Sequence, residues 1–213
     1  MRIPACKSPA PISTLLLLGL LLALAGCSRD ASPRLTSDER ALVRGEGAVM
    51  RVLTVNDTAD SLLLRTPCSD FARRDLASDD LRRLAERMVA TVTSPEQNGV
   101  GIAGPQVGLS RRIVAVQRFD KPDKPFEVFP NVRITALRGE QMEGREGCLS
   151  VPGRRGMVQR WQDIDIAYVS PYTLADTVEH VQGYTAVIFQ HECDHLDGVL
   201  YTDKCEPVPV DIH

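Results

Sequence analysis

The sequence predicts an α+β fold, and two observations carry this prediction. Two segments are expected to be helical: residues 78–93, whose apolar side chains recur with helical spacing, and residues 185–196. The segments between them are short runs rich in β-branched residues, separated by Gly and Pro. Strands that precede a single late helix favour α+β over the regular alternation of a parallel βαβ sheet.

The N-terminal part of the domain is expected to contain one extended segment and one helix. Residues 51–68 predict a strand or extended arm. Apolar side chains from Leu81 to Val92 then recur with the spacing of one helix face. Ser78, followed by two aspartates, is typical of an N-cap with an acidic first turn. Pro95 ends the pattern.

The central and C-terminal elements follow from composition. The stretch GVGIAGPQVG (99–108) has four glycines and a proline, so it cannot be a regular helix. TAVIFQHECDHL (185–196) predicts a helix that ends at Asp197-Gly198. The expected strands are RRIVAVQRF (111–119), FEVF (126–129), DIDIAYVS (163–170) and the end of TVEHVQGY (177–184).

Length indicates one folded domain, and the charge pattern argues against a nucleic-acid partner. The 213 residues are 43% hydrophobic and 25% charged, and the net charge is −3 with no long basic run. We expect a leader over residues 1–26, a flexible tether over 27–49, the catalytic domain over 50–206 and a tail over 207–213.

The N-terminus predicts export and a lipid anchor at a bacterial membrane. Two basic residues precede an apolar run over 14–25, which is too short to span a bilayer and fits a signal peptide. The run ends in LAGC, which resembles a lipobox and makes Cys27 the expected lipidation site. An uncleaved anchor and a plain signal peptide are alternatives. A start at Met50 would give a cytoplasmic form.

The stretch QHECDHLDG (190–198) contains H-E-x-x-H, a known zinc-binding pattern. On a helix, His191 and His195 share one face, so both could bind one ion. Glu192 would lie near the open coordination position. The alternative is a pair of helix histidines with ordinary core or surface partners.

A third ligand is not found among the remaining histidines or the downstream glutamate. The metzincin pattern fails because Tyr201 stands where its third histidine would be. Glu206 lies in a Pro-rich tail, which is a poor scaffold. His180 is expected to be an exposed strand residue, and His213 is the terminal residue.

Cysteine is the better candidate for the third ligand. Cys193 lies two residues from each histidine, so it faces elsewhere and is expected to be a packed thiol. Cys68 and Cys205 are either inert thiols or a disulfide pair. Cys148 lies in EGCLSVP (146–152), where a glycine allows the backbone to approach another group closely.

GVGIAGPQVG, EGCLSVP and QHECDHLDG, in this order, resemble the three motifs of peptide deformylases, and the similarity extends from about residue 53 to 203. The resemblance implies mostly antiparallel sheets packed around a C-terminal HExxH helix. It implies that Cys148, His191 and His195 hold one divalent metal ion, Fe²⁺ or Zn²⁺, with water as the fourth ligand. Glu192 would act as general base and then acid.

The resemblance also implies the substrate and its contacts. The substrate would be an N-formyl peptide, cleaved to formate and a free N-terminus. The Gln106 side-chain amide and the Leu149 backbone N–H would stabilise the oxyanion. Gly101 would let the extended peptide pair with the enzyme backbone.

Two other functions remain open at this point. One is a membrane-anchored metallopeptidase with the same site, and the other is a non-enzymatic metal- or peptide-binding lipoprotein. EGCLSVP together with Gln106 favours the deformylase over the peptidase, and the intact Glu192 disfavours the non-enzymatic protein. Outside the cytosol, ferrous iron and Cys148 would be open to oxidation, so we expect an exported form to prefer zinc or to tolerate oxidants.

Overall fold

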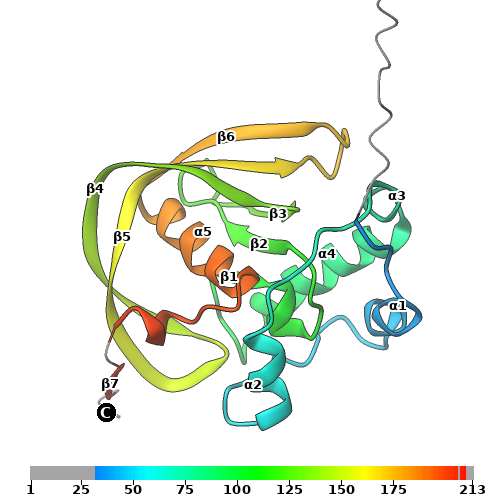
Figure 1. The fold of residues 1–213 in the computed structure, drawn as a ribbon, viewed down its shortest axis with the longest axis horizontal. Coiled ribbons are helices and arrows are strands. Elements are labelled where there is room, and N and C mark those ends of the chain that lie inside the picture. The colour runs from blue at the N-terminus through cyan, green and yellow to red at the C-terminus, as the bar shows by residue number, and fades with distance from the viewer. Residues whose placement is uncertain (1–31, 206, 210–213) are drawn as a thin grey trace, which may run out of the picture.

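The computed structural model describes residues 32–205 and 207–209. Two sheets enclose one long C-terminal helix, as Figure 1 shows. The first sheet is antiparallel with the order β1 (Gly101–Ala103), β2 (Ile113–Gln117) and β3 (Phe126–Pro130). The second has the order β4 (Arg133–Cys148), β5 (Val151–Val169) and β6 (Asp176–Gln182), and β7 (Pro207–Pro209) pairs with β5.

Alternation along β2 divides the core into two clusters. Ile113 and Ala115 pack into a cluster with helix α4 (Asp79–Val92) on one side of the first sheet. Val114 and Val116 point the opposite way, into a cluster with helix α5 (Gly183–Leu196). The two-residue period of a strand therefore places one helix on each face of this sheet.

The helix α5 is buried on nearly all sides because it lies between the two sheets. Its buried side chains include Phe189 and Leu196, which are fully inaccessible. A helix that is apolar around its circumference is expected in the core. The predicted helix and its stop are confirmed, since α5 ends at Leu196 and Gly198 has a φ of +74°.

The other predicted helix is confirmed as α4, with Ser78 at the N-cap position. The predicted strands are confirmed as β2, β3, β6 and the second half of β5. The structure also contains β4 and the first half of β5, which were not predicted as strands. These strands are largely exposed and form a long hairpin that curves around α5 (Figure 1).

The predicted strand over residues 51–68 is wrong in its second half. Residues 51–55 run extended, but helix α2 (Thr58–Leu64) follows, capped by Asp57, whose side chain accepts from the Asp60 N–H. A side-chain cap satisfies one of the free N–H groups at a helix start, and this local signal outweighs the β propensity of the segment.

The predicted flexible tether over 27–49 is also wrong where the structure describes it. Helix α1 (Ser37–Arg44) begins with a capping box between Thr36 and Glu39 and packs against α4. Val43 is fully buried. Ion pairs reach from α1 to distant residues, including Glu39 to Arg111 at 2.6 Å. These long-range contacts fix a segment whose polar composition alone suggests disorder.

The predicted C-terminal tail likewise contains β7, which pairs with residues 154–156 of β5. Cys68 is a free thiol, so it forms no disulfide with Cys205 in the described part of the chain. His180 lies exposed on β6 and Cys193 is buried, as predicted. Cys27, the predicted lipidation site, lies outside the described residues. No helix in the described part is long and apolar enough to span a bilayer.

Candidate metal centre and active site

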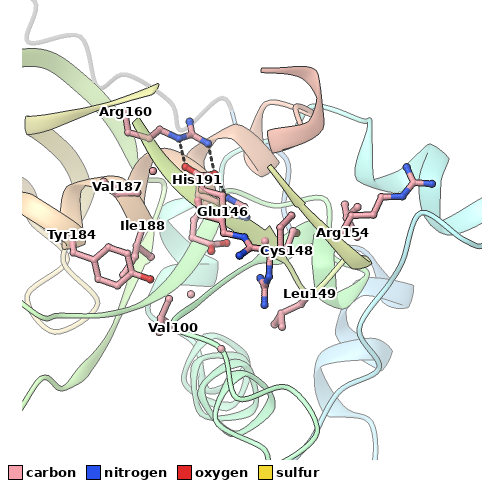
Figure 2. A pocket seen from close by; sticks show the side chains of 18 of the residues that line it. Val100, Glu146, Cys148, Leu149, Arg154, Arg160, Tyr184, Val187, Ile188 and His191 are labelled. Carbon is pink, nitrogen blue, oxygen red and sulfur yellow. Dashed lines mark hydrogen bonds and ion pairs between the residues drawn. The ribbon is translucent and has the colours of Figure 1, made fainter. Parts of the chain in front are cut away.

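A pocket of about 900 Å³ opens between β1, the β4–β5 hairpin and α5. Figure 2 shows Cys148, Glu146 and His191 on its wall, with Leu149 and Ile188 nearby. Three elements distant in the sequence thus contribute to one cavity. The site residues predicted from the sequence within the described part of the chain lie on or beside the wall of this pocket.

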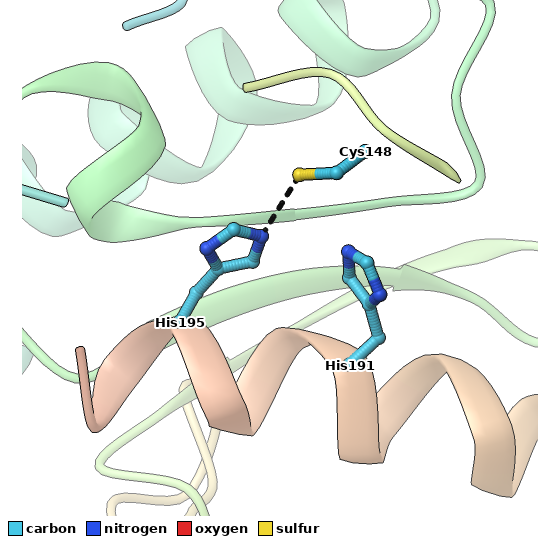
Figure 3. Close-up of side chains that lie close together, drawn as sticks. All are labelled: Cys148, His191 and His195. Atoms are coloured by element: carbon cyan, nitrogen blue, oxygen red, sulfur yellow. Dashed lines mark hydrogen bonds between the residues drawn. The ribbon is translucent and has the colours of Figure 1, made fainter. Parts of the chain in front are cut away.

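Cys148, His191 and His195, here called the Cys–His–His cluster, bring three ligand atoms within 4.8 Å of one another. The two histidines lie one turn apart on α5 and face Cys148 at the end of β4 (Figure 3). The His195 Nε2 atom lies 3.1 Å from the Cys148 Sγ atom. Because residues four apart share a helix face, the H-E-x-x-H spacing alone accounts for the histidine geometry.

Glu146 and Arg160 orient His191 from behind. The Nδ1 atom of His191 lies 2.8 Å from Glu146 Oε2. A carboxylate accepts hydrogen bonds, so Nδ1 carries the proton and Nε2 is left with its lone pair for a metal ion. Arg160 donates to both carboxylate oxygens of Glu146, at 2.7 and 3.0 Å, and both residues are buried.

The roles of Glu146 and Arg160 were missed in the sequence, although Glu146 begins the EGCLSVP motif. Its position two residues before Cys148, at a strand end, was the available signal. Burial opposes ionisation of Glu146, but Arg160 and His191 outweigh it and lower its pKa to about 2. Glu146 is therefore a stable acceptor for His191 throughout the physiological pH range.

Electrostatics favour the metal-binding form of the cysteine. Burial disfavours the Cys148 thiolate, but His195 and His191 overcome this effect and hold its pKa well below the usual value. Thiolate is the form that binds metal ions. One sulfur and two imidazole nitrogens, with a hydrogen-bonded carboxylate behind one of them, are a donor set that suits Zn²⁺ or Fe²⁺. The residues present therefore fit a single divalent ion.

Glu192 lies beside the cluster in a confined, apolar position. It is 4% exposed, and its Oε2 atom has no hydrogen-bond partner among the described residues. Burial raises its pKa to about 7, although His191 and His195 act in the opposite direction. A carboxylate with a pKa near neutrality can both accept and return a proton.

Gly101 is packed against this carboxylate. A Cβ atom on Gly101 would lie 2.5 Å from Glu192 Oε1 and 2.8 Å from Ile188 Cγ2. Glycine is thus required here for close approach of β1 to α5. The sequence predicted a substrate-binding role for Gly101, and the packing against Glu192 adds a second reason for glycine at this position.

Gln106 is held in place with its amide nitrogen toward Cys148. Its Oε1 atom accepts from the Ala103 N–H at 2.8 Å, so the amide orientation is defined. Its Nε2 atom lies 3.3 Å from Ser150 Oγ and 3.6 Å from Cys148 Sγ. Leu149, between Cys148 and Ser150, also lines the pocket.

The extended segment before α2 supports these residues from the opposite side. The Leu53 N–H donates to the Gln106 carbonyl at 2.8 Å, and the Val55 N–H donates to the Ser150 carbonyl at 2.9 Å. The motifs around Gln106 and Cys148 are thereby connected through one segment by backbone hydrogen bonds, which limit the movement of the polar groups around Cys148.

An H-E-x-x-H helix with a cysteine third ligand, a neighbouring buried carboxylate and an open pocket defines the class of single-metal hydrolases. A family model described as polypeptide deformylase matches residues 49–209. The chain belongs to this family and is a hydrolase that removes the formyl group from polypeptide N-termini.

Similar proteins agree with the family. A peptide deformylase of Leptospira biflexa is 34% identical over 167 residues, which cover 74% of this chain and 88% of the relative. Peptide deformylase 2 of a Nostoc species is 43% identical over 138 residues, covering 59% of this chain and 72% of the relative. The metallopeptidase and the non-enzymatic alternatives gain no support from these matches.

Solved structures give the same result for the fold. A class I type b peptide deformylase from Acinetobacter baumannii superposes with a TM-score of 0.66 at 34% identity, covering 74% of this chain and 99% of that chain. Another solved structure of the A. baumannii enzyme contains Met-Ala-Ser. A peptide deformylase from Thermotoga maritima has a TM-score of 0.64 at 30% identity, covering 75% of this chain and 99% of that chain.

Proposed function

We propose that this chain deformylates formyl-methionyl peptides, with Glu192 transferring the proton beside one divalent ion held by the Cys–His–His cluster. The observation that carries the proposal is the group of three ligand atoms within 4.8 Å, next to a buried carboxylate with a pKa of about 7. A divalent ion in such a site supplies Lewis acidity and lowers the pKa of water.

Glu192 performs both proton transfers. It takes a proton from the water that attacks the formyl carbon, and it returns this proton to the amide nitrogen as the carbon–nitrogen bond breaks. The products are formate and a free N-terminal amine. The burial of Glu192 supports this role, because it disfavours the charged carboxylate and keeps its basicity high.

Gln106 and Leu149 stabilise the negative charge that develops on the formyl oxygen. The Gln106 amide is fixed by its bond from Ala103, so its N–H groups are oriented before the substrate arrives. The Leu149 backbone N–H directly follows Cys148 in the chain and supplies the second donor. Donors that need no reorganisation contribute about 2.7–4 kcal/mol each in comparable sites.

The peptide binds along β1. This strand is at the edge of the first sheet, with β2 on its other side. An edge strand offers backbone N–H and C=O groups to an added extended peptide. Gly101, at the start of β1, lets the peptide backbone come close to Glu192, and the Met-Ala-Ser complex of the A. baumannii relative is consistent with a peptide ligand.

Glu192→Gln tests the assignment of the proton-transfer group. We expect unchanged metal content and a fall in formate release from formyl-Met-Ala-Ser of about 10²–10⁴-fold. Glu140→Gln, an exposed glutamate on β4, removes the same charge outside the pocket and should leave turnover unchanged. Loss of metal together with activity in Glu192→Gln would show that the carboxylate is structural.

The metal in the native protein is proposed to be zinc if the chain is exported. Thiolate and imidazole ligands suit both zinc and iron, but zinc has no redox chemistry and would leave the site intact in an oxidising compartment. Elemental analysis of protein purified from its native membrane measures this directly. A content of mainly iron would contradict the preference for zinc.

The membrane location is proposed from the leader alone, with Cys27 as the lipidated residue. Helix α1 begins at Ser37, ten positions after Cys27 in the sequence. Ten residues extend at most about 36 Å, so lipidation at Cys27 would keep the domain near the lipid surface. Cell fractionation should find the protein with membranes and Cys27→Ser in the soluble fraction. Equal distribution of both would refute lipidation at Cys27.

A further inference from the structure

Three arginines line the pocket, and none has an ion-pair partner among the residues that the structure describes. Arg145 lies near the end of β4, and Arg154 and Arg155 lie near the start of β5. All three are exposed. Among the described residues, none of them takes part in an ion pair or side-chain hydrogen bond, whereas Arg160, further along β5, is paired with Glu146 and Asp194.

The guanidinium group of Arg155 lies directly over Gly147. A Cβ atom on Gly147 would lie 1.5 Å from Arg155 Nη1 and 2.4 Å from its Cζ. Any side chain at position 147 would therefore displace Arg155. Since Gly147 immediately precedes Cys148, this packing holds a positive charge next to the metal ligand on the pocket wall.

Arg145 shares a face of the hairpin with Arg155. Arg145 is paired with Met157 in the antiparallel register, and residues paired across strands project to the same face. Arg155, two residues before Met157 on the same strand, projects to that face as well. Diagonal neighbours of this kind lie about 7–8 Å apart, within reach of one carboxylate held by two long side chains.

The remaining charges of the pocket do not neutralise this pair. Glu146 is already bonded to Arg160 and His191. Glu143 and Glu96 also line the pocket, but neither forms an ion pair with a described residue. Arg154 is adjacent, but Figure 2 shows its side chain extending away from Cys148. Two like charges on one face disfavour the folded hairpin and favour binding of an anion.

We propose that Arg145 and Arg155 bind a carboxylate of the peptide substrate downstream of the formyl-methionine. This inference rests on the proposed function, since it assigns a preference within the same substrate class. A guanidinium group binds carboxylates through two parallel N–H bonds. The enzyme therefore selects formyl peptides that carry an acidic side chain, or a free C-terminal carboxylate, at the second or third residue.

The test compares peptides that differ only in the carboxylate. Formyl-Met-Ala-Glu amide and formyl-Met-Ala-Gln amide differ in a side-chain carboxylate. Formyl-Met-Ala-Ala with a free C-terminus and its amide differ in a terminal carboxylate. We expect kcat/KM for formate release to be about fivefold higher for at least one acidic member, with the difference reduced at high salt.

Matched variants assign the preference to the arginines. Arg145→Gln and Arg155→Gln should each reduce the ratio of acidic to neutral kcat/KM toward one. Arg74→Gln, an exposed arginine on α3 (Arg73–Leu76) outside the pocket, removes the same charge and should leave the ratio unchanged. The peptide pair whose acidic member has the higher kcat/KM shows whether the arginines bind a side-chain or a terminal carboxylate.

The outcomes separate this inference from the proposed function. Formate release that is equal for acidic and neutral peptides would overturn the carboxylate preference and leave the deformylase activity standing. An equal fall of the ratio in Arg74→Gln would show that net charge, and not this pair of residues, is responsible, and would also overturn it. No release from any of the four peptides would overturn both.

Discussion

Val43→Ala tests whether α1 is a folded part of the enzyme or only a tether. Val43 lies in the middle of the contact between α1 and α4 and has no exposed surface. Removing its two methyl groups loses about 1.6 kcal/mol of apolar burial, at about 0.8 kcal/mol for each group. A residual cavity adds to this cost, so we expect a loss of about 2 kcal/mol in the free energy of unfolding.

Val49→Ala is a matched control, because it removes the same atoms from a side chain that is 50% exposed and lies outside helix α1. Its expected cost is within about 0.5 kcal/mol. For a domain of this size, the predicted difference corresponds to a Tm about 4–8 °C lower for Val43→Ala than for the native chain. Thermal unfolding followed by circular dichroism measures both variants under identical conditions.

Equal and small shifts for the two valine variants would refute the packing of α1. The segment 32–49 would then be a tether, as its composition suggested. The result also bears on a start at Met50, because a chain that begins there lacks α1 and all its contacts. In such a shortened chain, Arg87 would lose the backbone carbonyl groups of residues 42, 43, 46 and 47, to which its guanidinium group donates hydrogen bonds.

Three further predictions concern the site and its scaffold. Gly101→Ala should abolish most formate release and lower the Tm, because the added Cβ would collide with the Glu192 carboxylate and the buried Ile188 side chain; normal turnover would contradict the close approach. Glu146→Gln should weaken metal binding about 10–100-fold in a chelator competition, since it removes the charged acceptor of His191. The hydrogen bond from Arg44 is the largest cause of the lowered pKa of Asp80. Burial opposes this shift, and Arg40 adds to it. The folded pKa of Asp80 is below its unfolded value, so its stabilising contribution is present above pH ~4 and is lost as pH falls through the folded pKa. Asp80→Asn should therefore unfold with less pH dependence in acid, as urea titrations at several pH values would detect.

The parts of the fold that the sequence predicted depend on neighbours along the chain. The sequence signals for α4 and for α5 each lie within about fifteen residues, so local pattern was sufficient. The H-E-x-x-H spacing similarly encodes the relative position of His191 and His195. The contribution of Cys148, 43 residues upstream of His191, needed the resemblance to a family, because no local rule connects β4 to α5.

The parts that were missed depend on partners distant in the sequence. The helix α1 is polar, and its carboxylate and guanidinium groups are satisfied by residues 35 or more positions away, such as Arg40 with Asp75. The strand β4 has few buried side chains and exists because β5 supplies its hydrogen bonds. Composition reports the intrinsic preference of a segment, so the α1 segment was predicted as a tether and β4 was not predicted as a strand.

Arg160 shows the same limitation within the active site itself. Nothing around it in the sequence distinguishes it from the nearby Arg154 and Arg155, yet it is 3% exposed and they are exposed. The difference arises because β5 curves around α5, so Arg160 meets Glu146 on β4 and Asp194 on α5. One arginine thereby becomes a fixed support for a metal ligand. Arg155 forms no ion pair with a described residue, so its guanidinium group can meet the charge of a substrate at the pocket.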